Sequence, residues 1–166
     1  KQKDQIYQLI DLYTLFYMQF CHPASTDTAF WTHQMGKPRQ NTWYGLAFER
    51  ICMLHIPQIK QQLGIAQIYT EYYSWRSKLS TPASQIDLLI ERADNLVNLC
   101  EIKYSQAPYS ITKEEDMRIR TRIADFVGET KIRHGVLTTL ITTFGLRPNP
   151  YSSIAQVQLT MDDLFV

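Results

Sequence analysis

The chain has 166 residues, of which 45% are hydrophobic and 20% are charged, and its formal net charge at pH 7 is +1. This length and composition suit one compact domain with a hydrophobic core, and no apolar run approaches the ~20 residues that a membrane-spanning helix needs. A net charge this close to zero gives no overall attraction to nucleic acid or to an anionic membrane, so contact with a polyanion would require a local basic patch.

The first part of the chain is predicted to be mostly helical. Apolar residues between positions 6 and 20 follow helical spacing, although the aromatic content of this stretch also suits a strand. Turn-forming residues follow at 21–27 (CHPASTD), and a loop is predicted over 34–41 (QMGKPRQN). We expect residues 1–40 to form an N-terminal connecting segment.

A longer helix is predicted after this segment. It should begin near Trp43, with Asn41 or Thr42 as its N-cap, and it continues with apolar residues at helical intervals. Pro57 is expected to break or kink this helix, and Gly64 is expected to end its continuation.

The rest of the chain is predicted to form a sheet with one further helix. Strands are predicted at 66–76, 85–91, 96–103, 134–145 and 153–165, with a helix at 113–128. Thr112 and Glu115 form a capping box at the start of that helix, and Gly128 is expected to close it. The order predicts an α/β fold with a mixed central β-sheet of about four to five strands flanked by helices.

Residues 85–105 (QIDLLIERADNLVNLCEIKYS) place charges inside two strands whose other residues are typical of a buried sheet. The sequence ADN suits a tight hairpin turn, which would place Asp87 directly opposite Glu101. Directly opposed residues share one face of an antiparallel pair, and Lys103, two residues beyond Glu101, lies on that face as well. That face is predicted to hold Leu89, Val97 and Leu99 as well, and the other face is predicted to carry Ile86, Leu88, Ile90, Cys100 and Ile102.

This arrangement of charges favours a metal site. Two adjacent carboxylates repel, and each raises the pKa of the other unless they share a cation. Mg²⁺ or Mn²⁺ would resolve the conflict at Asp87 and Glu101, with the backbone carbonyl of Ile102 as a further hard ligand. Lys103 would then orient or help to deprotonate a metal-bound water. Asp87, Glu101 and Lys103 are therefore the candidate catalytic residues for metal-assisted hydrolysis of a phosphodiester.

An Asp on one strand, followed by Glu-x-Lys on the next, resembles the PD-(D/E)XK nuclease superfamily. Here the motif is QID at 85–87 and EIK at 101–103, with Ile86 in place of the proline that gives the superfamily its name. The resemblance implies a restriction-endonuclease-like core of order αβββαβ and a Mg²⁺-dependent nuclease, with DNA as the expected nucleic acid. It also implies that Glu49, on the helix before the strands, contributes to the metal site.

Four longer stretches resemble, more narrowly, the C-terminal nuclease-like domain of bacterial and archaeal ATPases of the AAA type. They are WYGLAFERICMLHIPQIKQQLGI, QIDLLIER, CEIKYS and VLTTLITTFGL. The resemblance implies that residues 41–166 form the nuclease-like domain and that the preceding segment connects it to an N-terminal ATPase domain of the same chain. Only that missing domain is expected to bind ATP. The chain starts without Met, as a piece of a longer protein would, and oligomerisation is left open.

The three cysteines indicate the cellular compartment. Cys21, Cys52 and Cys100 are odd in number, far apart and set among apolar residues. This pattern favours buried free thiols in a reducing compartment over a disulfide framework. We therefore expect a cytoplasmic protein without a membrane partner.

Each of these charges also has a purely structural interpretation. Asp87 could cap the hairpin or form a buried ion pair with Lys103, and Glu49 could pair with Arg50 on a solvated helix face. The basic residues of the helix at 113–128 could contact a phosphate backbone or simply face solvent; they are Lys113, Arg118, Arg120 and Arg122. A catalytically inactive nuclease-fold interaction or regulatory module of the ATPase is therefore the alternative function, because a fold alone does not decide activity.

Overall fold

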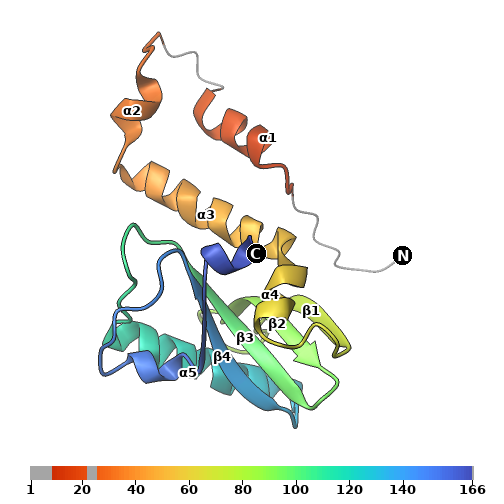
Figure 1. Cartoon of the computed structure of the whole chain (residues 1–166). Helices are drawn as coiled ribbons and strands as arrows, with labels where there is room; N and C mark the ends of the chain where they lie inside the picture. The colour runs from red at the N-terminus through yellow and green to blue at the C-terminus, as the bar shows by residue number, and fades with distance from the viewer. Residues whose placement is uncertain (1–8, 22–25, 166) are drawn as a thin grey trace. The chain divides into compact units, whose positions relative to one another are not determined.

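The computed structural model describes residues 9–21 and 26–165. The chain divides into two compact units, residues 1–50 and 51–166. This division falls inside helix α3, Pro38–Leu54, and so does the boundary between residues 40 and 41 that the sequence predicts. Figure 1 shows the elements of both units.

The described part of the first unit is helical. Helix α1, Leu12–Phe16, begins at Asp11, whose carboxylate accepts a hydrogen bond from the backbone N–H of Thr14 at 2.7 Å. A turn of π-helix, Tyr17–Cys21, follows directly. The alternative that this aromatic stretch forms a strand is therefore wrong, and the helical prediction is confirmed where the residues are described.

Aromatic side chains pack together in the first unit. Phe16 and Phe20 contact Trp31 edge to face, with ring centroids 5.0 and 5.2 Å apart, and Trp43 contacts the same two phenylalanines. Trp31 belongs to a short helix, α2, Phe30–Gln34, that the sequence did not predict. Residues 22–25 of the predicted turn lie outside the described residues.

Helix α3 begins at Pro38, five residues before the predicted start near Trp43. Proline suits the first position of a helix, because its fixed φ is helical and its missing N–H would have had no partner there. Thr42 is therefore inside the helix, and its hydroxyl donates to the backbone carbonyl of Pro38 at 3.0 Å. The predicted N-cap at Asn41 or Thr42 is wrong for this reason.

Helix α4, Ile56–Gln62, opens the second unit after the end of α3. Pro57 lies in its first turn, as expected for a residue that cannot continue the preceding helix. Gly64 has a positive φ of 69° just after the helix. This left-handed conformation favours glycine, and the predicted ends of both helices are confirmed.

A mixed five-stranded sheet forms the centre of the second unit (Figure 1). Its strands are β1 Thr70–Arg76, β2 Gln85–Arg92, β3 Leu96–Lys103, β4 Gly135–Thr142 and β5 Val157–Thr160. They lie side by side in chain order, with β1, β2 and β3 antiparallel and β3, β4 and β5 parallel. The predicted α/β class and the mixed sheet are confirmed, and β3 is the central strand.

Helix α5, Lys113–Thr130, connects the parallel strands β3 and β4. The capping box of Thr112 and Glu115 is present, with both reciprocal hydrogen bonds. The helix continues past Gly128 and ends at Lys131, which has a positive φ of 58°. The predicted end at Gly128 is therefore wrong, and Lys131 supplies the left-handed residue instead.

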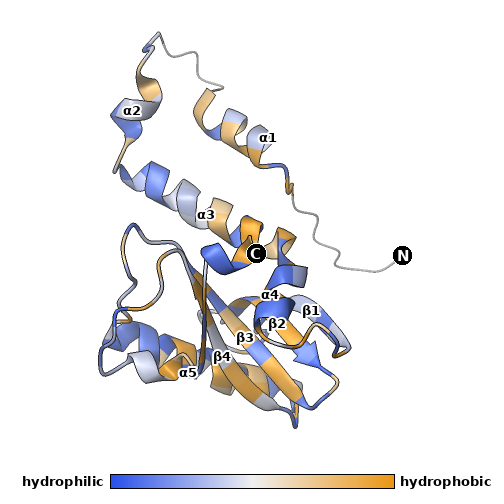
Figure 2. Cartoon of the chain, in the orientation of Figure 1, coloured by the Kyte–Doolittle hydropathy of each residue, from blue (hydrophilic) through white to orange (hydrophobic). Residues whose placement is uncertain are grey.

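One face of the sheet packs against α5. Leu89, Val97 and Leu99 are fully buried there against Phe126 of the helix. Figure 2 shows how hydrophobic residues concentrate along the strands of the sheet. The predicted common face of Leu89, Val97 and Leu99 is confirmed, and this face is the one that carries the charged residues described below.

A β-bulge interrupts strand β2. Tyr73 of β1 pairs with Leu89, whereas Trp75 pairs with Ile86, so β2 uses one more residue than β1 over this stretch. The extra residue changes the alternation of side chains. Ile86 consequently packs with Leu89 in the cluster against α5, and its predicted place on the opposite face is wrong. Asp87 lies within this bulge.

The structure bears on the predicted burial of the three cysteines. Cys52 and Cys100 are free and buried, but Cys21 is free and exposed, which differs from the prediction that all three are buried.

Within the described residues, no helix has both the length and the apolar character needed to cross a membrane.

Candidate functional site

Glu101 and Lys103 lie near the C-terminal end of the central strand β3. Glu101 is level with Leu140 of β4 in the parallel ladder, and Leu140 packs against Ile119 of α5. The alternation along β3 therefore directs Glu101 toward the helix, as it does Leu99. Burying a carboxylate between a sheet and a helix is costly unless cations or hydrogen-bond donors compensate for the lost water.

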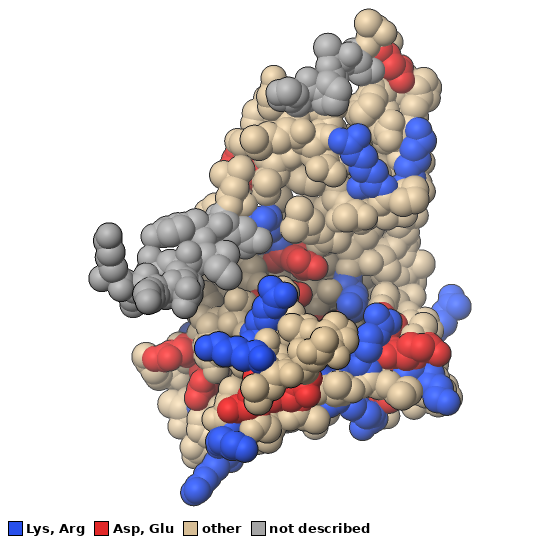
Figure 3. All heavy atoms as spheres, turned by 180° about the vertical axis from the view of Figure 1, so that it is seen from behind, with Lys and Arg blue, Asp and Glu red and all other residues tan. Residues whose placement is uncertain are grey.

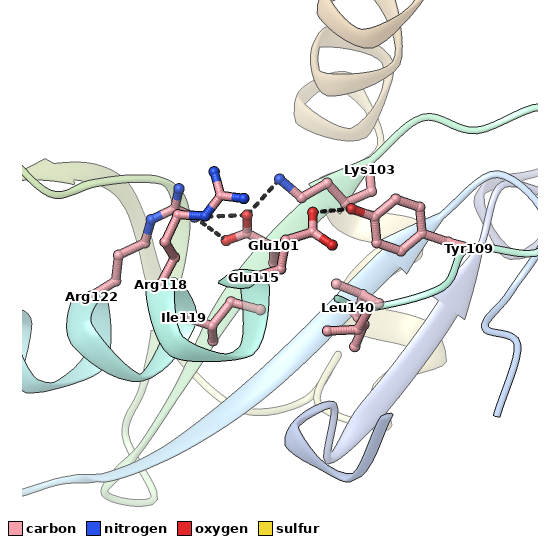
Figure 4. A pocket seen from close by; sticks show the side chains of 9 residues that line it. Glu101, Lys103, Tyr109, Glu115, Arg118, Ile119, Arg122 and Leu140 are labelled. Carbon is pink, nitrogen blue, oxygen red and sulfur yellow. Dashed lines mark hydrogen bonds and ion pairs between the residues drawn. The ribbon is translucent and has the colours of Figure 1, made fainter. Parts of the chain in front are cut away.

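Two cations compensate Glu101. Its side chain is only 9% exposed, and Nζ of Lys103 lies 2.8 Å from Oε1. Nη1 of Arg122, on α5, donates to Oε1 at 2.7 Å and to Oε2 at 2.5 Å. Figure 4 shows both cations converging on the carboxylate. Arg122 was only one of four basic candidates on its helix, so its specific pairing is a finding of the structure.

The cations control the pKa of Glu101. Burial makes the largest single contribution and raises the pKa, but the charges and hydrogen bonds of Lys103 and Arg122 together outweigh it and lower the pKa below its ordinary value. The sequence suggested that a shared cation would relieve a carboxylate pair. For Glu101 in this structure, side-chain cations from β3 and α5 fill that role.

A small cavity adjoins Glu101 and Lys103, with a volume of about 20 Å³. Its other walls include Tyr109, Glu115 and Arg118. A space of this size holds one or two water molecules, or a single ion without a full hydration shell. Figure 4 shows Glu101 and Glu115 among the side chains that line this pocket.

Glu115 is a second acid beside the cavity, and it was assigned only a capping role from the sequence. Its Oε1 accepts a hydrogen bond from the hydroxyl of Tyr109, while Oε2 accepts from the backbone N–H of Thr112 at 3.1 Å. Burial and this contact raise the pKa of Tyr109. Both oxygens of Glu115 are therefore used in fixing the start of α5.

Asp87 lies on β2, next to the last residue pair of its ladder with β3. That ladder has the predicted register and ends with Leu88 opposite Cys100, one position short of the predicted pair of Asp87 and Glu101. Asp87 is half-buried, and its Oδ1 accepts a hydrogen bond from Nε2 of Gln85 at 2.8 Å. The residues that line the cavity beside Glu101 do not include Asp87.

The two remaining candidate ligands lie on different elements. Ile102 is buried on β3, level with Ile141 of β4. Glu49 is a half-buried residue of α3 in the first unit. Their roles as metal ligands stay predictions from the sequence.

The three arginines of α5 fall into two groups. Arg118 and Arg122 line the cavity beside Glu101. Arg120 is exposed and makes a double hydrogen bond to Asp116, one turn away on the same helix. Arg120 therefore faces solvent, as the structural interpretation of this helix proposes, whereas Arg118 and Arg122 line the cavity.

The donor atoms suit a hard cation, but the charge of Glu101 is already compensated by Lys103 and Arg122. Carboxylate and carbonyl oxygens from Asp87, Glu101 and Ile102 are the ligand types that Mg²⁺ prefers. Within residues 9–21 and 26–165, however, no three His, Cys, Asp or Glu side chains are grouped closely enough to hold a metal ion. A metal ion at Glu101 would have to replace a side-chain cation.

Comparisons with known proteins leave the chain without an assigned family. It matches no protein-family profile and no curated protein. Among solved structures it is similar to one titled "Crystal Structure of Protein of Unknown Function AF1548", with 15% sequence identity and a TM-score of 0.46. The match covers 69% of this chain and 64% of that chain. A likeness at this level assigns no function.

Proposed function

We propose that this chain is a nuclease-like domain that hydrolyses phosphodiester bonds of nucleic acid, with DNA as the expected substrate and Mg²⁺ or Mn²⁺ as the cofactor. The observation that supports it best is the contact of 2.8 Å between Lys103 and Glu101 on the central strand, beside a cavity large enough for a single ion. Asp87 on the neighbouring strand completes the Asp and Glu-x-Lys motif. In this proposal the domain is the C-terminal part of an AAA-type ATPase, and ATP binds only to the ATPase domain.

Asp87 and Glu101 would hold the metal ion with their carboxylate oxygens, and Ile102 would add its backbone carbonyl. The bound ion would supply an activated water and neutralise charge on the phosphate. Lys103 is 31% exposed at its side chain, so its ammonium group can reach a water or phosphate oxygen at the mouth of the cavity. It would hold that oxygen by a charge-assisted hydrogen bond.

Nucleic acid would be bound by local contacts. Figure 3 shows Lys and Arg interspersed with Asp and Glu on the face in view, which differs from a continuous basic patch. The net charge of +1 agrees with this mixture. Affinity for DNA should therefore depend on a few cations such as Arg118 and Lys103, with a correspondingly small dependence on salt.

The compensation of Glu101 also supports the alternative, a nuclease-fold interaction or regulatory module of the ATPase. In that case Arg122 and Lys103 would be permanent partners of Glu101, and the charges would only hold α5 on the sheet. Buried ion pairs of this kind can be structural. The two functions differ in whether the site ever admits a metal ion.

Cleavage of plasmid DNA distinguishes them. The wild-type chain, Asp87→Ala, Lys103→Ala and the surface control Arg120→Gln are incubated with Mg²⁺ or Mn²⁺, alone and with the ATPase portion supplied. A nuclease at this site gives cleavage by wild type and Arg120→Gln, with a loss of more than about a hundredfold in the other two. Equal cleavage by all four proteins, or none by any, contradicts the proposed hydrolysis at this site.

A further inference from the structure

Arg122 lies between the cavity at Glu101 and a larger groove. The groove has a volume of about 620 Å³ and runs between α5 and residues 80–85, which lead into β2 and include its first residue, Gln85. Arg118 and Arg122 are the two residues that line both spaces, whereas Lys103 lines only the cavity. Of the two cations that pair with Glu101, Arg122 is therefore the one whose side chain also lines the groove.

We propose that Arg122 changes partners when a divalent metal ion binds: it releases Glu101 and turns into the groove, where it binds a phosphate of the nucleic acid. This inference rests on the proposed function, because it concerns the same site. It adds Arg122 as a substrate-binding residue and couples metal binding to nucleic-acid binding.

Charge is the first reason for this exchange. One carboxylate, Glu101, already contacts two cations, and a divalent ion at the same oxygens would place three positive groups together. Repulsion at such short range is strong where water is largely excluded. One side-chain cation should leave, and Lys103 has no lining position in the groove.

The side chain of Arg122 is suited to the move. It is 27% exposed, so its guanidinium group is already at the edge of the buried region. Its long flexible chain starts from α5, one helical turn after Arg118 on the same side of the helix. Two guanidinium groups would thus face the groove, and guanidinium binds phosphate oxygens in a bidentate manner.

The groove is also lined by two acids, Asp125 and Glu114. Asp125 lies on the same side of α5 and accepts a hydrogen bond from the hydroxyl of Ser84. Glu114 lines the far part of the groove near the start of α5. Asp125, one turn beyond Arg122, can hold the released guanidinium until a phosphate arrives.

Binding of Mn²⁺ tests the first half of the inference without any measurement of cleavage. Free Mn²⁺ is followed by electron paramagnetic resonance as it is titrated with the full chain. We expect Arg122→Gln to bind Mn²⁺ about tenfold more tightly than wild type, since the competing charged hydrogen bonds are gone. Arg122→Lys should lie between them, and Arg120→Gln should match wild type. Circular dichroism confirms that each variant is folded.

The outcomes separate this inference from the proposed function. Equal affinity of wild type, Arg122→Gln and Arg122→Lys, together with loss of binding in Asp87→Ala, would overturn the exchange and leave the metal site intact. Absence of Mn²⁺ binding in every folded variant, including those at Arg122, would overturn both.

The second half concerns nucleic acid. The affinity for a short fluorescent DNA duplex with phosphorothioate linkages, which resist hydrolysis, is measured by anisotropy with and without Mn²⁺. We expect Mn²⁺ to raise the affinity of wild type and Arg120→Gln by about tenfold and to have less effect on Arg122→Gln. An equal effect of Mn²⁺ on Arg122→Gln and wild type would show that Arg122 does not bind the phosphate.

Discussion

Arg122 and Glu101 are joined through one guanidinium nitrogen, which donates to both carboxylate oxygens at 2.7 and 2.5 Å. The contact links the central strand β3 to the crossover helix α5. It makes the charge of Glu101 depend on a residue outside the Glu-x-Lys motif. The stability of the domain and the accessibility of its candidate metal site should both reflect this one contact.

Removal of Arg122 should destabilise the domain. In Arg122→Met, Glu101 stays buried and keeps only Lys103, so we expect the free energy of unfolding to fall by about 2 kcal/mol. Urea denaturation at neutral pH measures the change. Arg120→Met is the matched control, because Arg120 lies on the same helix but pairs with Asp116 in solvent, and its stability should equal that of wild type. A loss in Arg122→Met no larger than in this control would contradict the prediction.

The lowered pKa of Glu101 predicts a dependence of stability on pH. Because the pKa is lower in the folded state than the ordinary value of 4.5, the ionised carboxylate contributes stability above that value. This contribution is lost as the pH falls below 4.5 through the pKa of the folded state. The stability advantage of wild type over Glu101→Gln should therefore be constant near neutral pH and shrink under acid conditions. Denaturation of both proteins over a pH series checks this, and an advantage that grows in acid would refute it.

The segment before β2 is tied to α5 by two carboxylates. Ser84 donates to Asp125, and Glu129 accepts hydrogen bonds from the hydroxyl of Ser77 and the backbone N–H of Lys78. In Asp125→Asn we expect the amides of residues 77–85 to exchange hydrogen about fivefold faster, since one charged contact is weakened. Mass spectrometry of hydrogen exchange measures this. Unchanged exchange in the segment would show that Asp125 does not hold the wall of the groove.

The capping box should contribute measurably to α5. Thr112→Ala removes the side-chain acceptor for the backbone N–H of Glu115, and we expect the free energy of unfolding to fall by about 1 kcal/mol. Thr121→Ala serves as the control, because that exposed hydroxyl only donates to a carbonyl within the same helix. Thermal unfolding of both variants tests the difference, which should vanish if α5 is held only by its packing on the sheet.

The sheet and the register of its hairpin could be predicted from the sequence. A turn signal at Asp94 and Asn95 between two runs of strand-forming residues fixes which residues face each other, and Asn95 has the positive φ of 65° that such a turn needs. Leu88 and Cys100 consequently pair as expected. Local turn chemistry and side-chain alternation carry this information together.

The bulge in β2 could not be predicted in the same way. It arises from the pairing with β1, where Trp75 lies opposite Ile86, and nothing within residues 85–92 signals an extra residue. The alternation of side chains along the strand therefore predicts the wrong face of the sheet for Ile86. The side on which Asp87 was predicted to lie depends on the same alternation.

The sequence contains one indication that Arg122 faces the sheet, and the prediction of the site did not include it. Arg122 lies three residues after Ile119 and four before Phe126, and both of these are buried residues of α5. Helical periodicity places all three on one side of the helix. The partner of Arg122 could still not be identified, because the rotation of α5 relative to β3 depends on packing between distant parts of the chain.

The bulge at Asp87 divides β2 into two stretches. Residues 88–91 are paired with β3 and residues 89–92 with the first part of β1, while residues 85 and 86 are paired with the end of β1. A residue added or lost in the segment 77–84 would shift the strand only as far as this irregularity, which can absorb the change. The bulge thereby keeps such a change from shifting the hairpin that carries Glu101 and Lys103. Natural or engineered loops of different length could therefore replace the segment 77–84 beside the groove.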